Sequence, residues 1–299
     1  MEIRLLRYFW TIAEEGTISR AADVLHITQP TLSRQLKSLE DELGTSLFVR
    51  DGKRMVLTEA GLLLKSRAEE ILSLSDATMK EFAERKSSLF SGNVSIGCVE
   101  ADNSDTMAVM LEELVSDYPQ VTFNIFTGTS DIIRDRLDKG LLDLAILLEP
   151  VSKEKYETFV LPRTERWGLL TSEESFLATK KVVHPEDIRG IPLLLSPRPE
   201  VQALVSDWMH CAYEDLNVVG TFNLLFNILP IVANQSASTF TIEGALNNRT
   251  DGVVFIPAEP RVDTNCVLVW RQGRVLSPVV QELIKRFKDA FGGMAQPSK

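Results

Sequence analysis

The chain has 299 residues, and at roughly 100–200 residues per domain this length predicts two or three domains. Hydrophobic residues make up 44% and charged residues 25%, a balance that excludes a wholly disordered chain or a fibrous repeat. The net charge of -10 argues against broad affinity for nucleic acid, but the first 58 residues, with eight basic and eight acidic side chains, leave room for a local basic face.

The sequence contains no run of 18 or more apolar residues, so no membrane span is predicted. Charged residues such as Arg4, Arg7 and Glu14 interrupt the N-terminus, so no secretory segment is predicted and the expected location is the cytoplasm. The few cysteines and histidines lie far apart in the chain: Cys98, Cys211, Cys266, His26, His184 and His210. They form neither a disulfide framework nor a spaced metal motif, and we expect no metal and no cofactor.

The first 44 residues have the pattern of three short helices. Residues 3–14 repeat apolar side chains at helical spacing, Thr17 can cap a helix over 18–25, and Thr28 can cap a third helix that Gly44 ends. Pro30 costs little in the first turn, where amides lack helical partners. The third helix has one predicted buried stripe, Leu32, Leu36, Leu39 and Leu43. Two short helices, a tight turn and a third helix predict a helix-turn-helix.

The opposite face of the third helix carries amide, hydroxyl and basic side chains: Gln29, Thr31, Ser33, Arg34 and Lys37. Gln and Arg can bond base edges in pairs, and hydroxyls suit phosphates, so this helix end is typical of one that enters the major groove. Two apolar runs around Asp51-Gly52 predict a hairpin, on which Arg50, Lys53 and Arg54 would meet the DNA backbone. An ordinary three-helix domain with a polar exterior is the alternative.

A long helix is predicted from Thr58, its N-cap, to about Ser87. Six residues on it follow a four-three alternation: Leu64, Ala68, Ile71, Ser75, Thr78 and Phe82. This is the period of a helix–helix seam, which favours dimerisation and would space two recognition helices about 34–36 Å apart. The alternative is a helix packed only on its own chain.

Strands and helices alternate beyond Ser91-Gly92-Asn93. Strands at 94–99, 121–126 and 144–148 enclose helices at 107–118 and 131–139, and this order predicts a largely parallel sheet. A second α/β unit is expected to start near Leu161, with strands at 167–170, 193–195, 218–219, 240–242 and 253–256. A late strand, 266–270, and a helix, 278–291, could return to the first lobe.

Ligands of open parallel sheets bind beyond the carboxyl ends of the strands. Those ends place Gly128, Thr129, Ser130, Ser196 and Asn223 as candidate effector-binding residues. The first three precede a helix, where free amides can hold an anion or a carbonyl oxygen, although Ser130 could simply cap that helix. Two acids at the mouth of the first strand, Glu100 and Asp102, would favour a cationic or neutral polar effector, unless they point to solvent.

A long stretch with fixed spacings resembles one family, that of LysR-type transcriptional regulators. The matching segments are Ala21-Ala22-Asp23-Val24-Leu25, Thr28-Gln29-Pro30-Thr31-Leu32-Ser33-Arg34-Gln35-Leu36-Lys37-Ser38-Leu39-Glu40, Leu43-Gly44-Thr45-Ser46-Leu47-Phe48-Val49-Arg50 and Leu57-Thr58-Glu59-Ala60-Gly61. The resemblance implies a homodimer whose third helices enter successive major grooves, with DNA contacts from Gln29, Pro30, Thr31, Ser33, Arg34 and Arg50. It also implies that the long helix dimerises, and it suggests higher assembly through the C-terminal lobes.

For the rest of the chain, the resemblance implies a two-lobed α/β effector domain like that of periplasmic solute-binding proteins, with a small-molecule cleft between the lobes. The expected organisation is a winged helix-turn-helix at 1–58, a linker helix at 59–90, lobe I at 91–161 and 267–299, and lobe II at 162–266. One departure concerns Ile231 to Ser238, which lacks the glycines usual in relatives, so the cleft could be partly filled.

The leading hypothesis is a regulator of transcription that binds a double-stranded operator, self-associates as a dimer or tetramer and is tuned by a small effector. RNA polymerase is a further candidate partner, and no membrane partner is expected. A cytoplasmic solute-binding or sensor protein, whose N-terminal unit serves only assembly, is the alternative. An enzyme is not expected, because the sequence shows no GxSxG, HExxH, P-loop or dinucleotide-binding glycine pattern.

Overall fold

The computed structural model describes residues 1–52, 54–84, 90–246 and 251–293, and it divides into two compact units, 1–86 and 87–299. Each unit has its own hydrophobic core. Lys53 and the expected end of the long helix near Ser87 lie outside the described residues, as does the side chain of Phe82.

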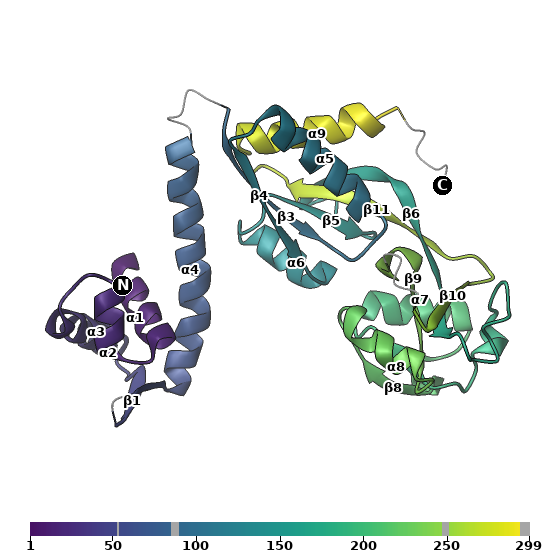
Figure 1. Ribbon diagram of the computed structural model, residues 1–299, viewed down its shortest axis with the longest axis horizontal. Helices are drawn as coiled ribbons and strands as arrows, with labels where there is room; N and C mark the ends of the chain where they lie inside the picture. Colours follow the sequence, from purple (N-terminus) through teal and green to yellow (C-terminus); the bar gives the residue numbers. More distant parts are fainter. Residues whose placement is uncertain (53, 85–89, 247–250, 294–299) are drawn as a thin grey trace. The chain divides into compact units, whose positions relative to one another are not determined.

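The first unit begins with three short helices: α1 (Ile3–Glu15), α2 (Ile18–Val24) and α3 (Gln29–Leu43) (Figure 1). Their apolar faces meet in a core that includes Leu6, Phe9 and Leu32, all at most 2% exposed. Gly16 and Gly44 end α1 and α3 with φ near +69° and +68°, a conformation that favours glycine. The predicted leucine stripe ends one turn early, because Leu43 is 41% exposed.

A two-stranded wing follows, with β1 (Phe48–Asp51) antiparallel to β2 (Arg54–Leu57). Two contacts fix it to the helices. The Glu40 carboxylate of α3 accepts a hydrogen bond from Leu47 N at 2.7 Å, and Met55 N donates to Gly16 O at 2.8 Å. The wing therefore has a fixed position beside α3 within this unit.

The long helix α4 (Glu59–Glu84) begins where predicted, because Thr58 Oγ1 accepts a hydrogen bond from Gly61 N at 3.0 Å. Its predicted seam is only partly free. Ala68 is fully buried in the core of its own unit and Leu64 packs against that core, so these two residues are not available to a partner. Ile71 of the seam is exposed, and so are four apolar residues of α4 outside the seam: Leu62, Leu63, Leu74 and Met79.

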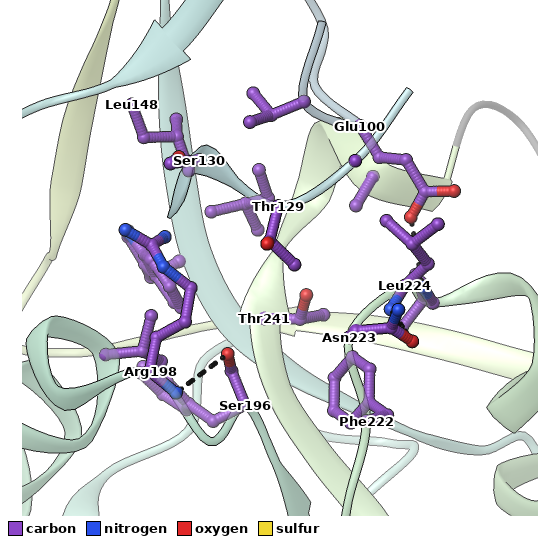
Figure 2. Close-up of a pocket in the computed structure, with 18 residues that line it drawn as sticks. Glu100, Thr129, Ser130, Leu148, Ser196, Arg198, Phe222, Asn223, Leu224 and Thr241 are labelled. Carbon is purple, nitrogen blue, oxygen red and sulfur yellow. Dashed lines mark hydrogen bonds between the residues drawn. The ribbon is translucent and has the colours of Figure 1, made fainter. Parts of the chain in front are cut away.

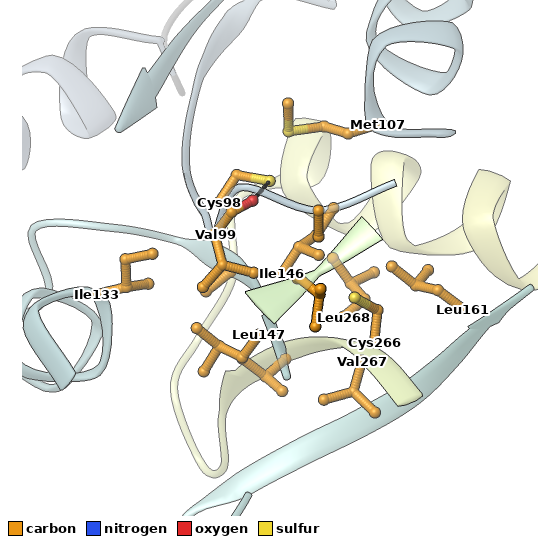
Figure 3. Packing of buried hydrophobic residues seen from close by; sticks show 14 of the residues in the cluster. Cys98, Val99, Met107, Ile133, Ile146, Leu147, Leu161, Cys266, Val267 and Leu268 are labelled. Carbon is orange, nitrogen blue, oxygen red and sulfur yellow. Dashed lines mark hydrogen bonds between the residues drawn. The ribbon is translucent and has the colours of Figure 1, made fainter. Parts of the chain in front are cut away.

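Lobe I of the second unit contains a parallel sheet of β3 (Gly92–Cys98), β4 (Val121–Thr127) and β5 (Leu144–Leu148), in the order β4-β3-β5. Helices α5 (Ser104–Asp117) and α9 (Pro278–Phe291) lie on one face of the sheet, and α6 (Ser130–Asp138) lies on the other (Figure 1). Figure 3 shows its core, where Cys98 and Cys266 sit among Ile146, Leu147 and Leu268.

Two long strands connect the lobes. β6 (Tyr156–Ser172) and β11 (Asp263–Arg271) pair antiparallel with each other, and β11 also pairs antiparallel with β5. The prediction of a parallel sheet is confirmed for β3, β4 and β5, and the two crossing strands add an antiparallel part, so the sheet as a whole is mixed. The chain must enter lobe II along one strand and return along the other, which makes the two crossing strands antiparallel.

Lobe II is built on β7 (Leu193–Leu195), which lies between β8 (Val218–Thr221) and β9 (Ser238–Ile242) in parallel register. β9 and β10 (Val253–Pro257) pair antiparallel with the second half of β6. Two helices, α7 (Pro199–Met209) and α8 (Leu229–Ala233), and the 3-10 turn Glu243–Leu246 complete the parts of this lobe that matter for the site.

Candidate nucleic-acid surface and effector cleft

The first turns of α3 present the predicted polar side chains to solvent. Leu32, Leu36 and Leu39 are buried, and this fixes which face of the helix points outward. Gln29, Pro30, Arg34 and Lys37 are exposed, and Thr31 and Ser33 are half-buried. On the wing, Arg50 and Arg54 are exposed.

Four cations of this surface have no ion-pair partner among the described residues. Within the described part of the chain Arg34, Lys37, Arg50 and Arg54 make no salt bridge, whereas Arg7 on α1 is paired with Asp76. Arg34 Nε lies 3.4 Å from Pro30 O, which keeps the guanidinium near the helix start. Unpaired cations on a convex helix end are suited to phosphates and base edges.

The N-cap of α3 differs from the expectation. Thr28 precedes the helix, but its side chain caps no backbone N–H group; its hydroxyl lies 2.8 Å from that of Thr31 instead. A groove of about 670 Å³ separates α3 from the wing, with Ser33, Lys37 and Arg50 among its lining residues. The two basic side chains face one groove from two elements, which suits a DNA backbone.

In the second unit, a cleft lies between the lobes (Figure 2). Six of the seven predicted effector residues line it: Glu100, Gly128, Thr129, Ser130, Ser196 and Asn223. Asp102 does not, and its side chain lines a different cavity. Aromatic rings of Trp167, Phe222 and Phe240 supply much of the apolar wall. The cleft has a volume of about 100 Å³, small beside the 300–1,000 Å³ of ordinary ligand pockets.

The start of α6 contributes unsatisfied polar groups to this cleft. Ser130 is the first helical residue and not the cap, so the expectation that it caps the helix is wrong. Its hydroxyl is buried at 3% exposure and has no hydrogen-bond partner among the described residues. The N-cap, Thr129, makes no side-chain cap bond either. Two hydroxyls and the first helical amides are thus available to an oxygen-bearing ligand.

Glu100 points across the cleft and not only to solvent. Its Oε2 atom accepts a hydrogen bond from the backbone N of Leu225 in lobe II, at 3.0 Å. Glu100 therefore joins the lobes on one side of the cleft, and a ligand that used this carboxylate would compete with that bond.

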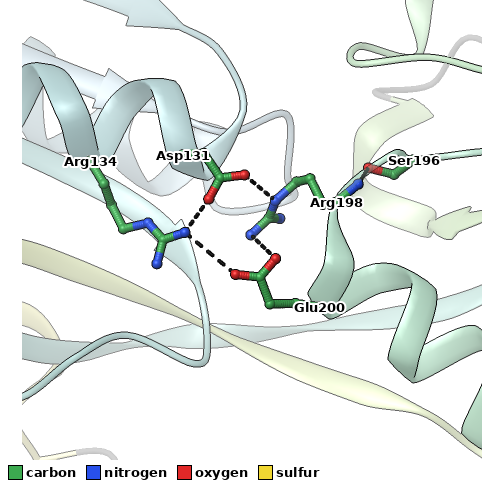
Figure 4. A network of polar contacts seen from close by, with 5 residues as sticks. All are labelled: Asp131, Arg134, Ser196, Arg198 and Glu200. Atoms are coloured by element: carbon green, nitrogen blue, oxygen red, sulfur yellow. Dashed lines mark hydrogen bonds and ion pairs between the residues drawn. The ribbon is translucent and has the colours of Figure 1, made fainter.

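A four-residue ion network joins the lobes on the other side (Figure 4). Asp131 and Arg134 of α6 face Arg198 and Glu200 at the start of α7, and Asp131 and Arg134 are themselves paired. Arg198 Nε lies 3.0 Å from Asp131 Oδ2, and Arg134 lies 3.5 Å from Glu200 Oε1. Burial by itself raises the pKa of Asp131, but bonds and charge from Arg134 and Arg198 outweigh it, so the pKa is lowered.

Arg198 lines the cleft and was missed by sequence reasoning. It follows Ser196 by two residues, and its backbone N donates to Ser196 Oγ at 3.4 Å. The only available signal was its position just after a strand end, beside the predicted Ser196.

The segment without the usual glycines lies elsewhere. Gln235 adopts φ +59°, a left-handed conformation that glycine would hold without strain. Gln235, Ala237 and Ser238 line a separate cavity and not the cleft. The small cleft is consequently due to its aromatic walls and the lobe contacts, and not to this segment.

The two buried cysteines, Cys98 and Cys266, are poor nucleophiles. Burial raises the pKa of the Cys98 thiol to about 11, and burial together with the charge of Glu165 raises that of Cys266. All three cysteines are free thiols. Among the described residues no group of His, Cys, Asp and Glu is arranged to hold a metal ion. Nor does any helix of these residues have the length and apolar character needed to cross a bilayer.

Comparison with known proteins identifies the class. Residues 3–62 match the model of the bacterial regulatory helix-turn-helix proteins of the lysR family, and residues 87–292 match that of the LysR substrate binding domain. The chain therefore belongs to the LysR family of bacterial transcriptional regulators.

Several relatives share its sequence. The regulator BsdA of Bacillus subtilis (strain 168) is 35% identical over 199 residues, which cover 65% of this chain and 67% of BsdA. The regulator YtlI of the same strain is 31% identical and is covered over 63% of its length. The dual regulator OxyR of Escherichia coli (strain K12) is 29% identical over 300 residues, 98% of this chain and 97% of OxyR.

Solved structures share the fold. The crystal structure of CbnR, a LysR family transcriptional regulator, superposes with a TM-score of 0.75 at 20% identity, over 97% of this chain and 99% of that one. Full-length CbnR in complex with its target DNA gives a TM-score of 0.74 over 97% of this chain and 100% of that one. At this identity the likeness shows a common architecture.

Proposed function

We propose that this LysR-family chain binds operator DNA through α3 and the wing, and that a small molecule in the cleft between the lobes regulates the binding. The observation that carries the DNA part is the exposed start of α3, whose polar side chains are free of ion pairs. We assign DNA contacts to Gln29, Pro30, Thr31, Ser33, Arg34, Lys37, Arg50, Lys53 and Arg54.

Two kinds of contact follow from the side-chain chemistry. Gln29 and Arg34 can form paired hydrogen bonds with adenine and guanine edges, and so they read sequence. The ammonium group of Lys37 and the guanidinium groups of Arg50 and Arg54 are suited to phosphates. They therefore set the affinity for DNA and its dependence on salt. The hydroxyls of Thr31 and Ser33 add directional phosphate bonds.

Self-association is part of this proposal. The exposed apolar residues Leu62, Leu63, Leu74 and Met79 on α4 need cover, and a second copy of α4 would supply it. We assign residues 1–58 to DNA binding, 59–90 to dimerisation, 91–161 with 267–299 to lobe I, and 162–266 to lobe II. A dimer can assemble into a tetramer, and RNA polymerase is the partner through which a bound regulator would act.

The chemistry of the cleft favours a small effector with an apolar body and an oxygen acceptor at one end. Ser130 and Thr129 would meet the acceptor at the start of α6, while Trp167 and Phe240 would contact the body. Ser196 and Asn223 would contribute from lobe II. Glu100 already accepts a bond from Leu225, which weakens the expectation of a cationic effector.

Regulation would act through the contacts that close the lobes. A ligand shifts a conformational equilibrium only by its differential affinity for the two states. A ligand between Thr129 of lobe I and Ser196 of lobe II would change the distance between the lobes. It would thereby lengthen or shorten two contacts between them, the Glu100–Leu225 hydrogen bond and the Arg198–Asp131 ion pair. These bonds are the elements through which occupancy would change the pose of the lobes.

The decisive experiment is selection of bound DNA from a random pool by the full chain, with and without metabolite mixtures. We expect enrichment of one motif with two half-sites and a change in enrichment or affinity with one mixture. If the chain bound selected and random DNA equally well at fixed salt, the DNA assignment would be wrong. We assign no catalytic activity to the chain, and because it acts on chromosomal DNA we place it in the cytoplasm.

A further inference from the structure

Helix α5 connects the junction of the lobes with the place where the chain enters the second unit. Its 14 residues give it a length of about 21 Å at 1.5 Å per residue. Three buried residues, Met107, Leu111 and Leu114, pack into the core of the second unit, and α9 lies on the same face of the sheet (Figure 1). A helix packed along its length moves as one body, so a shift at its start reaches its end.

The segment before α5, residues 100–103, contacts lobe II at two points. Glu100 Oε2 accepts the hydrogen bond from Leu225 N at 3.0 Å. Gly244 packs so closely on Asp102 that a Cβ atom at Gly244 would lie 2.3 Å from Asp102 N. Movement of lobe II therefore acts directly on residues that continue into α5.

The same segment is bonded to the crossing strand β6. Asp102 N donates to Glu165 Oε1 at 2.8 Å, and Asn103 Nδ2 donates to the backbone O of Arg163 at 2.9 Å. Asn103 is fully buried and is the residue that precedes α5. Because these bonds tie the start of α5 to the strand that joins the lobes, the start of the helix follows the pose of that strand.

The other end of α5 belongs to a cluster of four side chains, Phe90, Asp117, Tyr118 and Arg286. The ring centroids of Phe90 and Tyr118 lie 4.2 Å apart. Arg286 of α9 lies with its Cζ atom 5.6 Å from the Tyr118 ring centroid, and it donates to Asp117 Oδ2 at 2.7 Å. This Phe90 cluster fastens the end of α5 both to α9 and to Phe90.

Phe90 marks the place where the chain enters lobe I. In the sequence it follows α4 and lies two residues before β3. It is 37% exposed, so burial alone does not hold it, and the ring of Tyr118 is its aromatic neighbour. The position of Tyr118 therefore sets where the chain that follows α4 joins lobe I.

We propose that α5 couples the pose of the lobes to the Phe90 cluster, and thereby to the place where the first unit is attached. When the contacts of Glu100 or Gly244 change, the start of α5 shifts, and its far end moves Tyr118 and Phe90. The two states differ in the contacts between the lobes, which are the contacts that a ligand in the cleft would alter. For its effect on DNA this proposal rests on the proposed function, whereas the movement of α5 itself does not.

The first test is deuterium exchange of the full chain without DNA, measured by mass spectrometry. Glu100→Ala removes the hydrogen bond to lobe II, and we expect the amides of Tyr118 and Val121, at the end of α5 and the start of β4, to exchange at least about threefold faster. Glu112→Ala, which removes an exposed carboxylate from α5 itself, should leave their exchange unchanged. If the Phe90 cluster had only a structural role, these amides would not respond to Glu100→Ala, because Glu100 lies at the other end of α5.

The second test is a double-mutant cycle on the affinity for the selected operator. We expect Glu100→Ala to change this affinity by at least about fivefold, and Phe90→Ala to remove most of that change. Phe90→Tyr keeps the ring and should keep the coupling. Phe291→Ala truncates another ring of lobe I, which pairs with Phe287 of α9, and should leave the change intact. If Phe90→Ala does not fold, Asp117→Asn, an exposed residue that binds Arg286, takes its place.

Three results would overturn the proposal: unchanged exchange of Tyr118 and Val121 in Glu100→Ala, unchanged operator affinity in that variant, or the full change of affinity in the double variant Glu100→Ala/Phe90→Ala. A chain that bound no DNA sequence specifically would refute the proposed function instead. The exchange measurement would then decide the proposal about α5.

Discussion

The polar surface of α3 and the cleft between the lobes differ in one respect that governs what each can do. Around α3 the cations Arg34 and Lys37 have no ion pair within the described chain. In the cleft, Arg198 is paired with Asp131 and Glu200, and Glu100 is bonded to Leu225. One site is open to a partner, and the other is already occupied by the chain's own side chains.

The difference shows how one chain can carry both a surface that binds DNA and a cleft that responds to a ligand. A surface with no internal partners binds DNA without breaking bonds, so its affinity depends on charge and shape. A site whose groups are paired across two lobes responds to a ligand only if the ligand replaces those pairs. The same pairing makes the cleft small, because it draws the lobes together.

The largest effect should come from the open surface. Arg34→Ala removes a guanidinium group that can form two hydrogen bonds with the edge of a guanine. Operator binding should therefore weaken by about 1–3 kcal/mol, while binding to random DNA changes less. Gel shifts at fixed salt with operator and random competitor measure both. Arg67→Ala on α4, whose side chain is exposed and paired with Glu70, is the matched control. Unchanged operator preference in Arg34→Ala would show that α3 does not read sequence there.

Next in size should be the effect of the buried carboxyl. The pKa of Glu165 is raised above its ordinary 4.5, so ionisation costs folding free energy that appears as the pH rises above that value. Glu165→Gln should then stabilise the second unit at pH 7 by an amount on the order of 1 kcal/mol, with the gain vanishing near pH 4. Urea unfolding at both pH values measures this. A gain of equal size at the two pH values would mean that ionisation is not its cause.

A smaller effect is expected from the ion network. The pKa of Asp131 is lowered from its ordinary 3.8, so the stability it contributes is present above that value and is lost as the pH falls through the lowered pKa. Since the carboxylate is 45% exposed, Asp131→Asn should cost at most about 1 kcal/mol at pH 7. Because this network joins the two lobes, the substitution should also raise the radius of gyration of the chain without DNA or effector, as measured by solution scattering. The control is Asp135→Asn, which lies on the same helix and whose carboxylate pairs with Lys139 of the same lobe.

The smallest effect should be that of oxidation. Some relatives carry the name hydrogen peroxide-inducible genes activator, but here the pKa of Cys98 is about 11 and that of Cys266 is raised, so both stay protonated at neutral pH. Brief treatment with hydrogen peroxide should leave DNA binding unchanged, in the unmodified chain and in Cys211→Ser alike. A peroxide-dependent loss that disappears in Cys211→Ser would identify that half-buried thiol as reactive.

Much of the local structure could be predicted from the pattern of residues. The glycines after α1 and α3 and the cap at Thr58 mark their helix ends correctly, because these signals act within a few residues. Helix α7 was not predicted, although Pro199 opens it and its buried residues Val201, Val205 and Trp208 recur at helical spacing. The unbroken course of β6 was also missed, because only its second half has the apolar run of a buried strand.

The candidate sites divide in the same way. For the effector cleft, the rule that ligands bind beyond strand ends led to Ser130, Ser196 and Asn223, which line one cavity. The rule could not separate Glu100 from Asp102, two residues apart, because the backbone between them turns from one cavity into another. Glu165 gave no local signal, and the only signal for Arg198 was its position two residues after Ser196, since the charged partners of both residues are far away in sequence.

By itself, the sequence determined the helix-turn-helix, its outward polar face and the alternation of strands and helices, since each depends on neighbours a few positions apart. Only the tertiary structure decided which α4 residues pack against the core of their own unit and which polar groups of the two lobes pair. It also decided that Gly244 packs against Glu165 Oε2, a carboxylate oxygen that has no hydrogen-bond partner among the described residues. Contacts between residues 60 to 125 positions apart in the sequence depend on how the lobes pack, and the spacing of residues along the chain does not predict that packing.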